Sequence, residues 1–250
     1  MENELRIFSV SVCAEAQPKI LEKLKNMLDG EAQSKIFTPN TEMLLAASKD
    51  PSVTKLLNSA ELLIPDGIGI KIASHILSSP IPTRISGIDM AFELLKIAEV
   101  RNLSVFLLGG KPTVAQRAAE KLKSELPRLN ICGAHHGYFE KSGAENAAVI
   151  EEIRKASPNI LFVCFGFPMQ ERWICENLTA TALPSVRVAM RLGGSLDVWA
   201  GDKKRAPVLI QKLGFEWLWR ALPEPKRLKI LLEIPEFLYL SAKQKRRAEL

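Results

Sequence analysis

Short apolar runs that end in glycine or proline alternate with amphipathic segments along most of the chain, and this alternation is the strongest constraint on the fold. Residues 104–108 (SVFLL) and 160–165 (ILFVCF) are the clearest runs, and a segment with helical spacing of apolar residues follows each. Strands that alternate with helices at steps of roughly 25 residues are typical of a parallel sheet flanked by helices. We therefore predict a Rossmann-like α/β domain with a mostly parallel sheet.

The sequence indicates a cytosolic chain without a membrane span. The four cysteines are far apart and show no C-x-x-C spacing, which favours reduced residues of the core. The first ten residues, MENELRIFSV, lack the positive charge and long apolar run of a signal peptide. The longest uncharged run, residues 156–170, is too short and too rich in proline to span a bilayer.

Positive charge is concentrated in the last fifty residues. They hold 12 Lys and Arg against 6 Asp and Glu, which accounts for the whole net charge of +6. Apolar residues are interleaved with these charges from residue 225 onward at approximately helical spacing, interrupted by Pro235. Such a segment suits a membrane interface, and a helix packed on the body with solvated charges is the alternative. Nucleic acid is disfavoured because no binding motif is present.

No strand pattern is readable beyond residue 196, so we place a domain boundary there. The prediction is an α/β catalytic domain over residues 1–195 and a basic, amphipathic, helical appendage over residues 196–250, which associates with the membrane.

Asp66 is the first candidate for a chemical role. It follows the apolar residues 62–64, and Pro65 and Gly67 on either side of it break the strand and allow a turn. In parallel α/β sheets ligands bind beyond the carboxyl ends of strands, so Asp66 is a candidate general base. The alternative is that Asp66 caps the helix predicted over residues 68–77.

Other polar residues are predicted at the same edge of the sheet. Thr38 and Asn40 follow the strand at residues 35–37, and this loop becomes a neighbour of Asp66 if the two strands are adjacent and parallel. Gln170 lies in the first turn of the helix after residues 160–165, and Arg84 lies in a proline-rich loop.

Two further patterns have open interpretations. Gly109 and Gly110 follow a strand, which suits a phosphate approached by backbone N–H groups or simply a tight turn. The pair His135 and His136 has no third ligand at a recognisable spacing, so a metal site is disfavoured there.

Several motifs occur in an order that resembles one family. They are Thr38-Pro39-Asn40, Pro65-Asp66-Gly67, Arg84 with Gly87-x-Asp89, His136-Gly137-Tyr138-Phe139, Gly166-Phe167-Pro168-Met169-Gln170-Glu171-x-Trp173, Ala200-Gly201 through Arg205-Ala206-Pro207, Glu216-Trp217-Leu218-Trp219-Arg220, and Glu224-Pro225-x-Arg227. The chain is similar in these to glycosyltransferase family 26, bacterial enzymes related to the N-acetylmannosaminyltransferase of wall teichoic acid synthesis.

The resemblance implies an inverting transferase, peripheral on the inner face of the plasma membrane. Its expected substrates are a UDP-sugar donor, most simply UDP-N-acetylmannosamine, and a polyprenyl-diphosphate-linked N-acetylglucosamine acceptor. The resemblance assigns catalysis to Asp66 and Thr38. It assigns substrate binding to Asn40, Arg84 and Gln170, and the acceptor diphosphate to Arg220 and Arg227.

The resemblance implies no cofactor, and the chain lacks the D-x-D pair that holds a divalent metal in many UDP-sugar transferases. We therefore expect activity without metal. The chain also departs from the family. A glycine-valine-glycine run is usual before the region of Asp197, where this chain has Arg191-Leu192-Gly193-Gly194-Ser195, and Met169 replaces a usual lysine.

Three alternatives stay open. The donor sugar can be another one, such as N-acetylmannosaminuronic acid, glucose or glucuronate for an exopolysaccharide. The chain can be a membrane-anchored nucleotide-binding module without transferase activity. A NAD-dependent oxidoreductase is disfavoured because the fingerprint glycines are missing. The sequence leaves the oligomeric state open, and a homo-oligomer is compatible with it.

Overall fold

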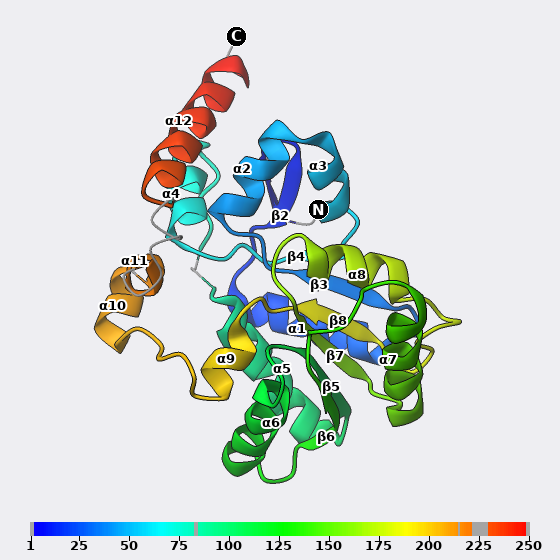
Figure 1. Ribbon diagram of the computed structural model, residues 1–250. Helices are drawn as coiled ribbons and strands as arrows, with labels where there is room; N and C mark the ends of the chain where they lie inside the picture. Colours follow the sequence, from blue (N-terminus) through cyan, green and yellow to red (C-terminus); the bar gives the residue numbers. More distant parts are fainter. Residues whose placement is uncertain (1–2, 83–84, 215, 222–229, 249–250) are drawn as a thin grey trace.

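The computed structural model describes residues 3–82, 85–214, 216–221 and 230–248 (Figure 1). The predicted binding residues Arg84 and Arg227 lie outside this part of the chain, as does the side chain of Arg220. In chain order the elements are β1 (Glu4–Ile7), β2 (Val10–Cys13), α1 (Gln17–Asp29), β3 (Ser34–Phe37), α2 (Thr41–Lys49), α3 (Pro51–Leu57), β4 (Leu62–Leu63), α4 (Ile68–Ile76), α5 (Gly87–Arg101), β5 (Ser104–Gly109), α6 (Val114–Glu125), β6 (Asn130–His135), α7 (Gly143–Ala156), β7 (Ile160–Cys164), α8 (Met169–Asn177), β8 (Val188–Arg191), α9 (Ser195–Trp199), α10 (Val208–Leu213), α11 (Glu216–Ala221) and α12 (Ile230–Ala248).

The main sheet has six strands in the order β4-β3-β8-β7-β5-β6, and every neighbouring pair is parallel. This confirms the predicted α/β class. Ile36 pairs with Leu62 and Phe37 with Leu63, so the strands that precede Thr38 and Asp66 are direct neighbours. After β5 and β7 the chain leaves in opposite directions, toward β6 and β8 respectively, and in open α/β sheets such a switch point is where ligands bind.

Helices cover both faces of this sheet. Apolar residues of α1, α5, α6 and α9 pack on one face, and those of α2, α3, α7 and α8 pack on the other. Consecutive strand residues alternate between the two faces: Ile36 and Phe162 belong to the first cluster, whereas Phe37 and Leu161 belong to the second. A sheet that is buried on both faces explains why its strands are almost uninterrupted apolar runs.

The N-terminal segment is an antiparallel hairpin that is separate from the main sheet. Strands β1 and β2 pair through Leu5 with Val12 and Ile7 with Val10, which buries these four side chains on one side. The chain reverses at Phe8, whose φ of 55° is left-handed. Phe8-Ser9 lacks the glycine or asparagine typical of such turns, and the hairpin therefore had no sequence signal.

The C-terminal helix α12 runs alongside α4 and α2 (Figure 1). Phe237 of this helix is fully buried and packs edge-on against Phe8 at 5.6 Å between ring centroids. The predicted interruption at Pro235 was wrong, because the helix continues through this residue. Pro235 lacks only one N–H donor, and the packing of the turns that follow it supports the helix on the body.

Candidate functional site

The loops after β3 and β4 meet at the carboxyl edge of the sheet, as their adjacent parallel strands require. The backbone N–H of Asp66 donates to the carbonyl of Pro39 at 2.8 Å. Asp66 also pairs with Ile85 in an isolated parallel bridge, and its Oδ2 accepts from the backbone N–H of Gly87 at 3.3 Å. The alternative in which Asp66 caps α4 was wrong, since the N-cap residue of that helix is Gly67.

Thr38 lies directly against the residue that binds Asp66. Its side chain is buried, and a Cβ added to Gly87 would come within 2.9 Å of Thr38 Oγ1. Glycine at position 87 therefore lets Thr38 approach while its N–H holds the carboxylate of Asp66. Asn40, from the same loop as Thr38, accepts from the N–H of Met43 at 3.0 Å and caps α2.

A buried polar network lies beneath these loops, and we call Thr38, Gln170, Glu171, Arg191 and Gly193 the site floor. Arg191 donates from Nη1 to the carbonyl and Oγ1 of Thr38 at 2.6 and 2.8 Å. Its Nε donates to Glu171 Oε1 at 2.8 Å. Gln170 donates to the same Oε1 at 3.1 Å and accepts from the N–H of Gly193 at 3.0 Å. Loops that follow three strands are thereby joined.

Burial dominates the electrostatics of the site floor. Glu171 and Gln170 have no exposed surface, and burial raises the pKa of Glu171 while the Arg191 guanidinium opposes that rise. The second oxygen of Glu171, Oε2, has no hydrogen-bond partner among the described residues. A buried carboxylate held mainly by one arginine depends strongly on that partner.

Sequence reasoning placed Gln170 at this edge but gave Arg191 no role. Arg191 ends the apolar strand β8, in which it is the only charged residue. A single arginine within a strand buried on both faces was the available signal, because such a charge requires a partner.

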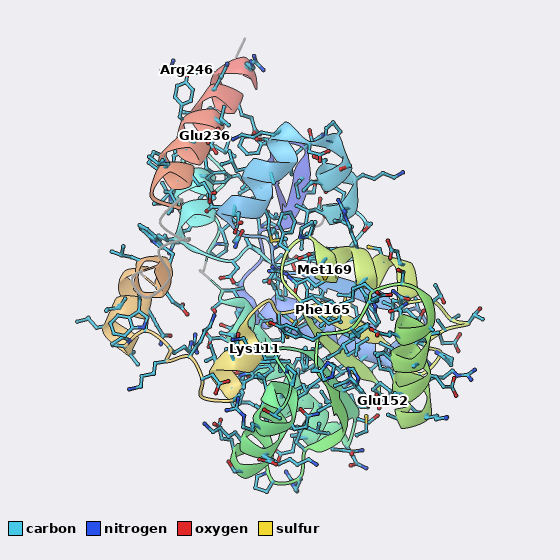
Figure 2. The ribbon with its side chains drawn as sticks, viewed as in Figure 1. Lys111, Glu152, Phe165, Met169, Glu236 and Arg246 are labelled. Carbon is cyan, nitrogen blue, oxygen red and sulfur yellow. The ribbon has the colours of Figure 1, made fainter. Side chains whose placement is uncertain are left out.

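Gly109 and Gly110 form a crowded turn at the end of β5, against the end of the neighbouring strand β7. Their φ values are 138° and 70°, and a Cβ on Gly109 would lie 2.3 Å from the carbonyl oxygen of Cys164. The N–H of Gly110 already donates to that carbonyl at 3.2 Å. These contacts favour the tight-turn interpretation. Lys111, labelled in Figure 2, follows the turn with an exposed side chain.

The loop after β6 is organised around a lysine. Lys141 donates to the carbonyls of Gly137 and Phe139 at 2.7 and 2.6 Å, and its ammonium lies 3.7 Å from the ring centroid of Phe139. Burial lowers the pKa of Lys141. The histidine pair is engaged locally, since His135 contacts the carbonyl of His136. Within the described part of the chain no three His, Cys, Asp or Glu residues come together as metal ligands.

Arg205 connects the segment after α9 to the Asp66 side of the site. It contacts both carboxylate oxygens of Asp89 at 2.6 and 2.8 Å. These bonds raise the pKa of Arg205, and the charges of Glu216 and Asp66 add to the effect. Arg205 therefore lies within electrostatic range of the Asp66 carboxylate.

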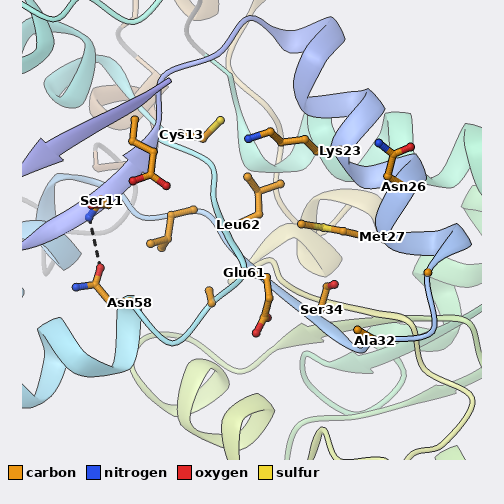
Figure 3. Close-up of a pocket in the computed structure, with 14 residues that line it drawn as sticks. Ser11, Cys13, Lys23, Asn26, Met27, Ala32, Ser34, Asn58, Glu61 and Leu62 are labelled. Carbon is orange, nitrogen blue, oxygen red and sulfur yellow. Dashed lines mark hydrogen bonds between the residues drawn. The ribbon is translucent and has the colours of Figure 1, made fainter. Parts of the chain in front are cut away.

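A cavity of about 620 Å³ lies at the opposite edge, where the strands begin (Figure 3). Its lining includes Ser34 and Glu61 at the start of β3 and β4, Cys13 of β2, and Lys23 and Met27 of α1. None of the predicted site residues lines this cavity.

No helix in the described residues is both long and apolar enough to cross a bilayer. The apolar side chains that α10 and α12 expose are instead short patches. Val208, Leu209, Leu232 and Tyr239 are between 65% and 79% exposed.

Comparison with known proteins assigns the chain to a family. The model of the "Glycosyl transferase WecG/TagA/CpsF family" matches residues 5–250. Curated relatives from Staphylococcus aureus strains MRSA252, MW2 and NCTC 8325 are each 38% identical over 231 residues, which cover 92% of this chain and 88% of the relative. Each is named N-acetylglucosaminyldiphosphoundecaprenol N-acetyl-beta-D-mannosaminyltransferase. The match spans both the sheet and the C-terminal helices, and the chain belongs to the WecG/TagA/CpsF family of glycosyl transferases.

Proposed function

We propose that this chain transfers N-acetylmannosamine from a UDP donor to N-acetylglucosamine on a polyprenyl diphosphate, with Asp66 as the general base. The observation that carries the proposal is the setting of Asp66. Its carboxylate lies at the carboxyl edge of a parallel sheet, held by the N–H of Gly87 instead of capping a helix. The names of the Staphylococcus aureus relatives support this sugar and this acceptor.

The chemistry is a single displacement. The acceptor hydroxyl oxygen forms a bond to the anomeric carbon of the donor sugar while the bond from that carbon to the UDP oxygen breaks. Asp66 accepts the hydroxyl proton as the new bond forms. UDP leaves with the electron pair of the broken bond. We take the donor to be the α-linked UDP sugar, so this attack inverts the anomeric carbon and gives the β product named for the relatives.

The departing diphosphate requires positive charge or N–H donors. Lys111 is an exposed cation beside the β5 turn, and the resemblance adds Arg84 for the donor side and Arg220 and Arg227 for the acceptor diphosphate. We propose that these groups act without a divalent metal. Gly109 and Gly110 shape the turn beneath the donor, and Asn40 and Gln170 fix the loops that surround it.

We also propose that residues 196–250 act as the membrane-binding appendage on the inner leaflet. The exposed apolar residues Val208 and Leu209 on α10 and Leu232 on α12 supply an interfacial surface. The last turn of α12 contains Lys245, Arg246 and Arg247, and Arg246 lies near the far end of the helix in Figure 2. Apolar surface combined with basic charge binds anionic lipid surfaces.

The test is UDP release by purified protein with a panel of UDP-sugars, with and without a short-chain polyprenyl-diphosphate-N-acetylglucosamine acceptor, in EDTA. We expect release from UDP-N-acetylmannosamine that depends on the acceptor. Asp66→Asn should lower kcat by about 10²- to 10⁴-fold, the usual contribution of a general base. Asp29→Asn removes a carboxylate that bonds Arg101 on the surface, and it should leave the rate unchanged.

Two outcomes would contradict the proposal. A wild-type rate for Asp66→Asn would show that Asp66 is not the general base. Folded protein that binds UDP but releases none from any donor would instead favour a nucleotide-binding module.

A further inference from the structure

The least expected group in the site floor is a buried cation in the middle of the sheet. Arg191 ends β8, and its side chain is only 10% exposed. A charge buried to this degree requires partners in the loops around it.

The guanidinium binds two separate segments at once. Nη1 donates to both oxygen atoms of Thr38, and Nε donates to Glu171. A guanidinium is planar and fixed in shape, so its donors hold these acceptors at defined positions in a way that a flexible lysine ammonium does not. Thr38 and Arg191 are 153 positions apart in the chain.

The hold on Thr38 reaches the proposed base through one further residue. Thr38 Oγ1 packs against Gly87, and the N–H of Gly87 binds Asp66 Oδ2. Because Arg191 donates to Oγ1 and cannot accept, the Thr38 hydroxyl keeps its own proton to donate to another acceptor. Displacement of Thr38 would then disturb both that donor and the contact beside Asp66.

We propose that Arg191 is a positioning residue for sugar transfer, which fixes Thr38 next to the Gly87–Asp66 pair and is itself held by Glu171. The inference rests on the proposed function, because it concerns the geometry of the same site. Glu171 supplies the countercharge that keeps Arg191 in place, and Gln170 extends the same network to the N–H of Gly193.

The test combines Arg191→Lys with Thr38→Val in a double-mutant cycle. Arg191→Lys keeps a positive charge near Glu171 but loses the two hydrogen bonds from Nη1 to Thr38. It should therefore lower kcat by at least about tenfold, as a small misplacement of a catalytic group does. The KM for each substrate should stay within about twofold. In the Thr38→Val background the same lysine replacement should cost less than about threefold, because the hydroxyl that it positions is already absent.

The matched control is Arg187→Lys. Arg187 lies just before the other end of β8 and donates to the carbonyl of Glu31 at 2.6 Å, so its replacement should leave kcat unchanged. Arg191→Lys with wild-type kcat would overturn the proposal. So would equal losses from Arg191→Lys in both backgrounds, since that result means that Arg191 supports only the fold.

A second measurement separates this inference from the proposed reaction. Urea unfolding of the wild type, Arg191→Lys, Thr38→Val and the double variant reports the contact between Arg191 and Thr38 without any substrate. Each variant raises the equilibrium constant of unfolding by some factor relative to the wild type. The factor for the double variant should be smaller, by at least about threefold, than the product of the factors for the two single variants. Coupling in urea without turnover by the wild type would refute the transfer reaction alone, whereas independent effects in urea would refute the contact.

Discussion

The site floor and the C-terminal helix α12 are stabilised by different kinds of contact. The floor joins loops from three strands through buried hydrogen bonds and one buried ion pair. The helix α12 is held by a buried ring, Phe237, together with surface bonds such as Lys49 to Glu236 and Lys245 to Ser78. Buried polar networks fix a geometry, whereas exposed ion pairs contribute little. The two regions should therefore respond differently to the same kind of perturbation.

The largest expected effect is a loss of stability in α12 that leaves the sheet unchanged, and it follows from replacing Phe237. Phe237→Ala removes a fully buried ring from between α12 and the hairpin, and we expect it to destabilise the docked helix by about 3 kcal/mol. Hydrogen exchange should then accelerate over residues 230–248 and stay slow in β7 and β8. Acceleration of similar size in both regions would mean that helix and sheet unfold as one unit.

The control for this variant lies on the same helix. Tyr239 is 67% exposed, and Tyr239→Ala should leave the exchange rates of α12 almost unchanged.

A smaller effect is expected at the membrane. Val208 and Leu209 are exposed side chains on α10. Replacement of both by serine should weaken binding to vesicles of anionic lipid by about tenfold, roughly the effect of losing one buried methylene group at each position. Turnover of a water-soluble acceptor analogue should not change. Equal loss on vesicles and on the soluble analogue would place these residues in the site instead.

The smallest effect concerns the pH dependence of the site floor. Burial raises the pKa of Glu171 above its ordinary value of 4.5, so the unfolded chain loses this proton at a lower pH than the folded one. The contribution of Glu171 to stability is fully present below about pH 4.5 and is lost as the pH rises through the folded pKa.

Urea unfolding from pH 4 to pH 7 measures this contribution against Glu171→Gln, which cannot titrate. The stability of the wild type relative to the variant should fall as the pH rises. A relative stability that rises with pH would show that the Arg191 guanidinium outweighs burial at this carboxyl group.

Much of the architecture followed from local pattern. The apolar runs and their glycine or proline endings predicted a mostly parallel sheet flanked by helices. The similar junctions at Thr38 and Asp66 predicted that their loops meet, as the bond from Asp66 to Pro39 confirms. These features depend on short segments of sequence, and so the pattern was sufficient.

The errors arose where distant residues decide the outcome. Arg191 acquires its role from Thr38 and Glu171, which lie 153 and 20 positions away, and no local spacing indicates such partners. Asp66 preceded a helix and resembled a cap, but its partner is Gly87, 21 positions further on. The catalytic and binding roles of the predicted residues, and the boundary at residue 195, stay predictions.

The contact between the hairpin and α12 has a consequence for synthesis of the chain. The side-chain amide of Gln244 accepts from the N–H of Phe8 at 2.7 Å and donates to the carbonyl of Arg6 at 3.0 Å. These partners are 236 positions apart. A ribosome synthesises the N-terminus first, so the hairpin emerges early. More than two hundred further residues must be synthesised before Phe237 can cover Phe8. Docking of α12 on the hairpin is thus a late step, because it requires synthesis to have passed residue 244.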